Sequence, residues 1–320
     1  MRLFSLVFLL VPLFTFSQNP VSESFQKDSL IIIKSNTSKG FNNSYVLFIP
    51  KGTLKNKLTY LLVEPNNTGK TSDSLMIHKK SAIALASISS VGNNISTNLK
   101  IPLLVPIFPR PNSKPLVYTH ALDRDVIFET DEKLERLDLQ LIAMIKNAQD
   151  VLNDCGILIY DKFFMNGFSA SATFTNRFLF IHPEKVKAAA MGGLNGELML
   201  PFKKYKNKEF NYPLGINDFK KIFNKESNLN RLKEIPQYIY MGLEDQNDAV
   251  QFDDAYNNIE RNTINSTLGN NVQERWINCQ NIYKKENISV QFKTYDKVGH
   301  WTTSTINLNV SKFFLKQLQK

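Results

Sequence analysis

The stretch FFMNGFSASATFTNRF, Phe163–Phe178, is the part of the sequence that best indicates the fold. It begins as a tight apolar run typical of a buried strand, turns through GFSAS at Gly167–Ser171, and continues in a helical pattern. A strand that passes through a sharp turn into a helix is the context in which a Gly-x-Ser-x-Gly-like pattern presents a nucleophilic serine. Taken without that context, the five turn residues fit an ordinary structural turn equally well, because Gly and Ser are common in turns.

The sharp turn restricts the residues on both sides of Ser169. The backbone crowds the positions two before and two after the serine, so both residues must be small. Gly167 meets this demand, and Ser171 meets it less well than glycine would. With a strand before the turn and a helix after it, we expect Ser169 to be a nucleophile.

Strands and helices alternate on both sides of this stretch. Short apolar runs bounded by Asn, Gly and Pro predict strands over 29–34, 44–50, 58–64, 100–108, 163–166, 186–192, 235–241 and 288–295. Helical patterns lie over 73–90, 130–154, 170–181, 272–285 and 307–318. Alternation of this kind requires crossover connections, so we predict an α/β fold with a mostly parallel eight-stranded sheet and helices on both faces.

The predicted sheet belongs to one domain, residues 18–320. No long Pro/Ser/Gly-rich linker and no internal repeat divides it. Between the sixth and seventh strands lies the segment 195–234, which is rich in Tyr, Phe and Lys. We expect an insertion here, which would either form a lid over the site or pack as a surface excursion on the sheet edge.

The N-terminus, 1–17, has the pattern of a secretory signal peptide. Arg2 precedes an apolar run that is short for a membrane span and is interrupted by Pro12. A non-cleaved anchor is the alternative interpretation. No other long apolar stretch follows, so we predict a secreted or periplasmic protein with no membrane association after signal cleavage.

Charge and cysteine content point to few partner classes. The formal net charge is +10, but the lysines are scattered, which is weak evidence for nucleic acid. We therefore predict no nucleic-acid partner and a basic, self-repelling surface. With only Cys155 and Cys279, the chain has no metal-binding cysteine cluster, and we predict no metal site. Export permits a bridge between these two cysteines, and the sequence leaves that pairing open.

A nucleophilic serine needs a base, and the chain has four histidines. His300 follows the last predicted strand in YDKVGHW and is the best candidate, because its loop would return over the carboxyl edge of the sheet. His182 fits a helix cap that faces away, and His78 fits a helix surface. His120 follows the fourth strand and is a candidate for lining a substrate cleft or supporting the site.

The base needs an acid, and three carboxylates follow the seventh predicted strand in GLEDQND, Gly242–Asp248. Asp245 lies three residues past the glycine that ends the strand, close enough to the sheet edge to reach an imidazole. Asp248 is the second candidate and resembles the cap of the next helix. Glu244 is expected to point to solvent.

The reaction also needs N–H donors for an oxyanion. We expect one from the backbone of Ala170, at the start of the helix after the serine. The other is expected from the loop after the third strand, Val63–Gly69, with Asn67 preferred over Thr68. This loop also fits a surface turn.

The order Ser169, Asp245, His300, each after a strand, resembles the α/β-hydrolase family over nearly the whole chain after the signal. Most similar are secreted esterases of the polyhydroxyalkanoate-depolymerase, feruloyl-esterase and dienelactone-hydrolase type, with Gly-x-x-Asp at Gly242–Asp245 and Gly-His at Gly299-His300. The departure is Ser171, where the motif usually has glycine. The resemblance implies that Ser169 attacks an ester or amide carbonyl, that His300 carries the proton, that Asp245 orients His300, and that no cofactor is needed.

Two further residues are predicted to contact substrate. Arg110, in the Pro-rich segment Pro106–Pro115, would form a wall that meets an acidic substrate group, and Trp301 lies beside His300. The favoured function is an exported carboxylesterase acting on a small-molecule or polymer-linked ester. The alternatives are a catalytically inactive hydrolase-fold protein that binds a glycan or peptide, and a serine peptidase.

Overall fold

The structure, a computed structural model, describes residues 23–88 and 90–319, so the predicted signal peptide lies outside the described residues. Its main feature is an eight-stranded sheet in the order β1-β2-β4-β3-β5-β6-β9-β10. The strands are β1 (Ser29–Ile33), β2 (Tyr45–Ile49), β3 (Leu62–Val63), β4 (Leu103–Pro106), β5 (Phe163–Phe168), β6 (Val186–Gly192), β9 (Gln237–Gly242) and β10 (Val290–Tyr295). Strand β2 is antiparallel to β1 and β4, and the other neighbouring pairs are parallel. The predicted fold class is confirmed.

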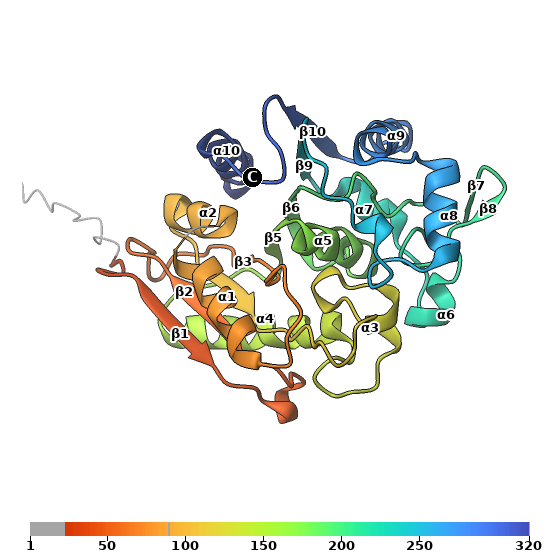
Figure 1. Cartoon of the computed structure of the whole chain (residues 1–320). Coiled ribbons are helices and arrows are strands. Elements are labelled where there is room, and N and C mark those ends of the chain that lie inside the picture. Colours follow the sequence, from red (N-terminus) through yellow and green to blue (C-terminus); the bar gives the residue numbers. More distant parts are fainter. Residues whose placement is uncertain (1–22, 89, 320) are drawn as a thin grey trace, which may run out of the picture.

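Helices cover both faces of the sheet. They are α1 (Leu75–Ser87), α2 (Val91–Leu99), α3 (Arg124–Phe128), α4 (Leu137–Asp154), α5 (Ala170–Ile181), α6 (Phe219–Phe223), α7 (Leu229–Glu234), α8 (Asn258–Thr267), α9 (Val272–Lys285) and α10 (Ser304–Leu318). Apolar side chains of α1, α2 and α10 share one core, and those of α4, α5 and α9 share the other. Figure 1 shows α10 lying beside α2 on the face that they cover together.

Strand β5 lies between the two cores, which explains why Phe163, Phe164 and Met165 are all apolar. Phe163 and Met165 enter the core with α5, whereas Phe164 enters the core with α10. A strand buried on both faces shows no polar alternation. Each of these side chains is at most 1% exposed, a burial that stabilises the fold by about 2–3 kcal/mol per phenylalanine.

The predicted helices omit α2, α3, α6, α7 and α8, and two of the differences have a clear physical reason. Helix α2 was not predicted, because VGNNISTNL contains few strong helix formers. It forms because Val91 and Ile95, one turn apart, are buried and because the Ser90 hydroxyl accepts the Asn93 N–H at 2.9 Å. The helix predicted from residue 130 begins at Leu137, so Asp131, Glu132 and Glu135 lie before the helix.

The insertion 195–234 packs against the domain over much of its length. It contains the two-residue strands β7 (Lys204–Tyr205) and β8 (Lys208–Glu209), followed by α6 and α7. Phe210 and Tyr212 are fully buried in the larger core, and the Tyr212 hydroxyl donates to the Leu122 carbonyl at 2.5 Å. The lid interpretation stays a prediction.

Neither cysteine is bridged: Cys155 is partly exposed, and Cys279 is buried in α9. Burial raises the pKa of the Cys279 thiol to about 12, so this side chain acts as an apolar core residue. Across residues 23–88 and 90–319, none of the helices combines the length and the apolar character needed to cross a membrane.

Candidate active site

Ser169 lies at the junction of β5 and α5 in a strained backbone conformation. Its φ is +60° and its ψ is −129°, a region that L-residues with a side chain rarely occupy. The Ser169 N–H donates to the Gly192 carbonyl at 2.8 Å, which anchors the turn to the end of β6. The turn therefore has the geometry of a nucleophile elbow.

The small residues around the elbow have separate roles. A Cβ at residue 167 would collide with the backbone of Ser171 and Ala172, so this position requires glycine. The Ser171 hydroxyl accepts the Phe168 N–H at 2.9 Å and donates to the Phe168 carbonyl at 2.8 Å. Serine is therefore accommodated where the motif usually has glycine, and its hydroxyl closes the turn.

Three side chains from separate loops form one hydrogen-bonded chain. His300 Nε2 lies 2.9 Å from Ser169 Oγ. His300 Nδ1 lies 3.1 Å and 3.0 Å from the two carboxylate oxygens of Asp245. With the imidazole proton on Nδ1, the ring donates to Asp245 and accepts from the serine hydroxyl, the arrangement required of a general base.

The loops that carry His300 and Asp245 are joined because β9 and β10 are neighbouring parallel strands. The Glu244 N–H donates to the Val298 carbonyl at 2.9 Å. A Cβ at Gly242 would collide with that same carbonyl, so glycine permits the close approach. Adjacency in the sheet thus brings together residues that are 55 positions apart in the sequence.

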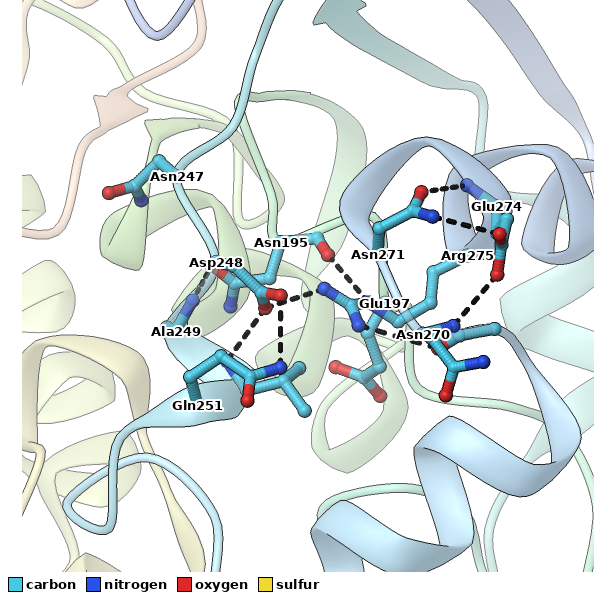
Figure 2. Close-up of polar contacts among 12 residues, drawn as sticks. Asn195, Glu197, Asn247, Asp248, Ala249, Gln251, Asn270, Asn271, Glu274 and Arg275 are labelled. Carbon is cyan, nitrogen blue, oxygen red and sulfur yellow. Dashed lines mark hydrogen bonds and ion pairs between the residues drawn. The ribbon is translucent and has the colours of Figure 1, made fainter.

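Asp248, the second candidate for the acid, faces a different partner. Its carboxylate forms an ion pair with Arg275 at 2.5 Å and caps the short 3-10 helix at Ala249–Gln251, as its sequence position suggested. Figure 2 shows Arg275 of α9 reaching Asp248, and its Nε donates to the Asn195 carbonyl at 3.1 Å. Asp245, which is 1% exposed, is the carboxylate that contacts His300.

The expected oxyanion donors lie next to the elbow. Ala170 is the first residue of α5, where backbone N–H groups lack partners within the helix. The side-chain Nδ2 of Asn67 lies 3.5 Å from the Phe168 carbonyl, and the backbone carbonyl of Asn67 accepts from the Ser81 hydroxyl at 3.1 Å. The loop after β3 therefore lies beside Ser169. Thr68, the second candidate in this loop, uses its hydroxyl to donate to the Lys70 carbonyl.

A small, largely polar cavity adjoins the serine. It is lined by Tyr118, Ala121, Ser169, Ala170, Thr173, Arg177, Asn195, Asn247, Ala249, Ala255 and Tyr256. Apart from Ser169 and Ala170, none of these residues was predicted to belong to the site. One available signal was the spacing in α5: Thr173 and Arg177 follow Ser169 at intervals of four, which places all three along one side of the helix.

Two predicted substrate contacts have other partners in the structure, and for His120 the burial favours its alternative role of supporting the site. His120 is fully buried, with Nε2 3.0 Å from the Phe108 carbonyl and 3.3 Å from the Asn66 amide, so it supports the loops and does not line the cavity. Burial lowers its pKa to about 3, which keeps it neutral. Arg110 forms an ion pair with Asp254 and stacks 3.6 Å from the Tyr118 ring centre, so its charge is already matched.

The other ring side chains weighed in the sequence lie outside the cavity. Trp301 is 53% exposed and remains a predicted substrate contact beside His300. His182 caps α5 and lies 2.8 Å from Asp138, consistent with a cap that faces away. His78 is fully buried, which corrects its expected surface position.

The part of the chain that the structure describes contains no group of three His, Cys, Asp or Glu residues placed to hold a metal ion. The reacting groups that the site does contain are a hydroxyl, an imidazole and a carboxylate, with backbone N–H groups nearby. This set of groups can perform acyl transfer.

The chain is similar in fold to solved hydrolase structures along most of its length. Poly(aspartic acid) hydrolase-1 from Sphingomonas sp. KT-1 matches with a TM-score of 0.57 at 15% identity, over 92% of this chain and 100% of that one. A poly(3-hydroxybutyrate) depolymerase from Bordetella parapertussis matches with a TM-score of 0.54 at 12% identity, over 92% and 90%. An S-formylglutathione hydrolase from Agrobacterium tumefaciens matches with a TM-score of 0.52 at 10% identity, over 91% and 94%.

These likenesses and the strand order define the class: the chain has the α/β-hydrolase fold, as predicted. A scan against protein-family models and a search of curated proteins found no match. The fold by itself does not specify the reaction, because one fold can carry many chemistries, so the reaction depends on the residues of the site.

Proposed function

We propose that the protein is an exported serine hydrolase that cleaves a carboxylic ester through an acyl-enzyme intermediate. The observation that carries this proposal is the chain of contacts from Ser169 Oγ through the His300 ring to Asp245, at 2.9 Å and 3.0 Å. The strained conformation of Ser169 adds support, since such strain is typical of functional positions.

In the proposed reaction, the Ser169 oxygen bonds to the ester carbonyl carbon while its proton passes to His300 Nε2. Asp245 accepts from Nδ1–H and stabilises the imidazolium. The backbone N–H groups of Ala170 and Asn67 donate to the oxyanion. His300 then returns the proton to the leaving alcohol as the carbon–oxygen bond breaks, and water releases the acid by the same steps in reverse.

The comparisons support a hydrolase with this type of substrate. The poly(3-hydroxybutyrate) depolymerase and the S-formylglutathione hydrolase bear names of ester- and thioester-cleaving enzymes. The substrate of this chain is proposed to be a small-molecule or polymer-linked ester, met outside the cytoplasm after removal of the signal peptide, and no cofactor takes part in the proposed reaction.

The proposal is tested by labelling the purified protein with a fluorophosphonate probe and measuring turnover of p-nitrophenyl acetate. Wild type is expected to react with both, and Ser169→Ala with neither. Ser38→Ala, a change at an exposed serine in the 3-10 helix Thr37–Lys39, is the matched control and should behave as wild type.

Continued labelling of Ser169→Ala would contradict the assignment of the nucleophile. A folded wild-type protein that is neither labelled nor active would instead favour a hydrolase-fold binding protein.

A further inference from the structure

Two buried arginines lie near the candidate site, and their charges are matched differently. Arg275 is fully buried and forms an ion pair with Asp248. Arg177, on α5, is 2% exposed and donates to the Ala121 carbonyl at 3.0 Å and to the Tyr256 hydroxyl at 2.9 Å. In the described part of the chain, Arg177 forms no ion pair with a carboxylate, so its bonds are to neutral oxygens.

The acidic groups near Arg177, among them Glu197 and Asp123, raise its pKa, but neither carboxyl is in direct contact with its guanidinium. The Tyr256 hydroxyl, which accepts from Arg177, donates to Glu197 Oε2 at 2.6 Å. The other oxygen of this carboxyl group, Oε1, has no hydrogen-bond partner. Burial raises the pKa of Glu197, and it raises the pKa of Asp123 to about 7. Both carboxyls therefore hold protons more strongly than exposed ones. Arg177 therefore keeps its charge without a carboxylate in direct contact, and a ligand carboxylate would be its first direct anionic partner.

Arg177 lines the same cavity as Ser169. Between them on α5 lies Thr173, which is 4% exposed and whose hydroxyl has no hydrogen-bond partner. Asn195 and Asn247, from the loops after β6 and β9, also line this cavity. The cavity thus places Ser169 near a buried cation without a direct carboxylate partner and near a hydroxyl without a hydrogen-bond partner.

The size of the cavity limits what it can hold. Its volume is about 20 Å³, where a single buried water needs about 10–15 Å³. The space accommodates one to two water-sized groups, such as the two oxygens of a carboxylate, whereas a long acyl chain or an aromatic ring does not fit.

We propose that this cavity binds a carboxylate of the ester substrate, a few atoms from the scissile carbonyl, with Arg177 and Thr173 as donors. The inference rests on the proposed hydrolase function and adds its substrate class: esters that carry an acid group on the acyl or the alcohol part. Hydrogen bonds between charged groups discriminate strongly when buried. An acidic substrate should therefore exceed its neutral isostere by about 10- to 100-fold in kcat/KM.

The first test uses the wild-type protein and two pairs of esters. The acyl pair is the 4-methylumbelliferyl hemisuccinate and the corresponding levulinate, in which a methyl group replaces one carboxylate oxygen. The alcohol pair is 3-acetoxybenzoate and 3-acetoxybenzamide. In one of the two pairs, kcat/KM is expected to be higher for the acidic ester than for the neutral one. The pair that shows this preference identifies whether the acyl or the alcohol part enters the cavity.

Equal or better turnover of the neutral ester in both pairs, with Ser169 still reactive toward the fluorophosphonate, would overturn the inference and leave the hydrolase function intact. If Ser169 does not react with the probe, the hydrolase function fails, and the inference fails with it.

The second test compares variants by the ratio of kcat/KM for the preferred acid and its neutral isostere. Thr173→Val removes a hydroxyl without a partner, so the fold should be retained and the ratio should fall several-fold. Arg177→Met should abolish the preference, and Arg177→Lys should keep part of it. Thr175→Val, on the same helix but outside the cavity, is the matched control and should keep the wild-type ratio.

Circular dichroism shows whether Arg177→Met folds. If it does not, the carboxylate site is tested by the kcat/KM ratio of Thr173→Val and by the two ester pairs measured on wild type. An unchanged ratio in folded Thr173→Val and Arg177→Met would overturn the roles proposed for these residues.

Discussion

At the scale of single residues, two aspartates three positions apart have different tasks. Asp245 accepts from the ring of His300, whereas Asp248 pairs with the fully buried Arg275. In the proposed mechanism, Asp245→Asn would favour the wrong imidazole tautomer and lower kcat by about 10³- to 10⁴-fold with little change in stability. Ester turnover, measured beside thermal unfolding, checks this prediction.

Asp248→Asn is the matched control for that prediction. It leaves Arg275 buried with its charge unpaired, so it should lower the free energy of unfolding by about 3–5 kcal/mol. The folded fraction should keep most of its activity. If Asp248→Asn lost activity without losing stability, the two aspartates would have exchanged roles and the assignment of Asp245 would be wrong.

At the scale of elements, the junction of β5 and α5 depends on contacts between its two sides. Gly167→Ala would drive a methyl group into the backbone of Ser171 and Ala172. We expect this clash to lower the free energy of unfolding of the variant by about 1–3 kcal/mol. Relief of the clash would move Ser169, so the variant should also lose labelling by a fluorophosphonate. Chemical denaturation and probe labelling measure both effects.

Ser171→Ala tests the same junction with a smaller change. It removes two hydrogen bonds to Phe168, so it should cost about 1–3 kcal/mol while leaving labelling of Ser169 largely intact. Full labelling of Gly167→Ala at wild-type stability would show that the elbow does not depend on this close contact.

At the scale of the whole molecule, the sheet buries a carboxyl that follows β3. Glu64 is 2% exposed, and its Oε2 lies 3.4 Å from the Ser90 hydroxyl, close to Gly92 of α2. Burial raises its pKa to about 7, whereas an unfolded chain has a glutamate pKa of about 4.3. Since the folded state holds the proton more tightly, the stability that this group contributes is present below pH ~4 and is lost as the pH rises through about 7.

Glu64→Gln keeps a neutral side chain of similar size at every pH. The variant should match wild type near pH ~4 and exceed it by about 1–3 kcal/mol near pH ~8. Urea unfolding across this range measures the difference. Burial also raises the pKa of Asp123 to about 7, and Asp123 remains in the variant. The free energy of unfolding should therefore still fall with rising pH in the variant, but less steeply than in wild type. A difference in stability that is constant with pH would contradict the prediction.

The sequence was most informative where structure depends on near neighbours. The bounds of β6, α5 and α9 match the predicted ranges, since periodic burial and turn residues are local properties. The strand-to-helix turn around Ser169 and the positions of Asp245 and His300 after neighbouring strands were likewise predicted. Helix α2 was missed because its formation depends on tertiary packing of Val91 and Ile95 and not on propensity.

Only the folded chain distinguished residues of similar appearance in the sequence. Arg110 seemed suited to an acidic substrate, but Asp254, 144 positions away, pairs with it, whereas Arg177 lines the cavity. His120 was a candidate for the cleft and is buried against Phe108. The sequence does not distinguish an arginine or a histidine that is paired or buried from one that is free to contact a substrate. Its role depends on which distant loops meet at the carboxyl edge of the sheet, and strand order in space, not order along the chain, decides that meeting.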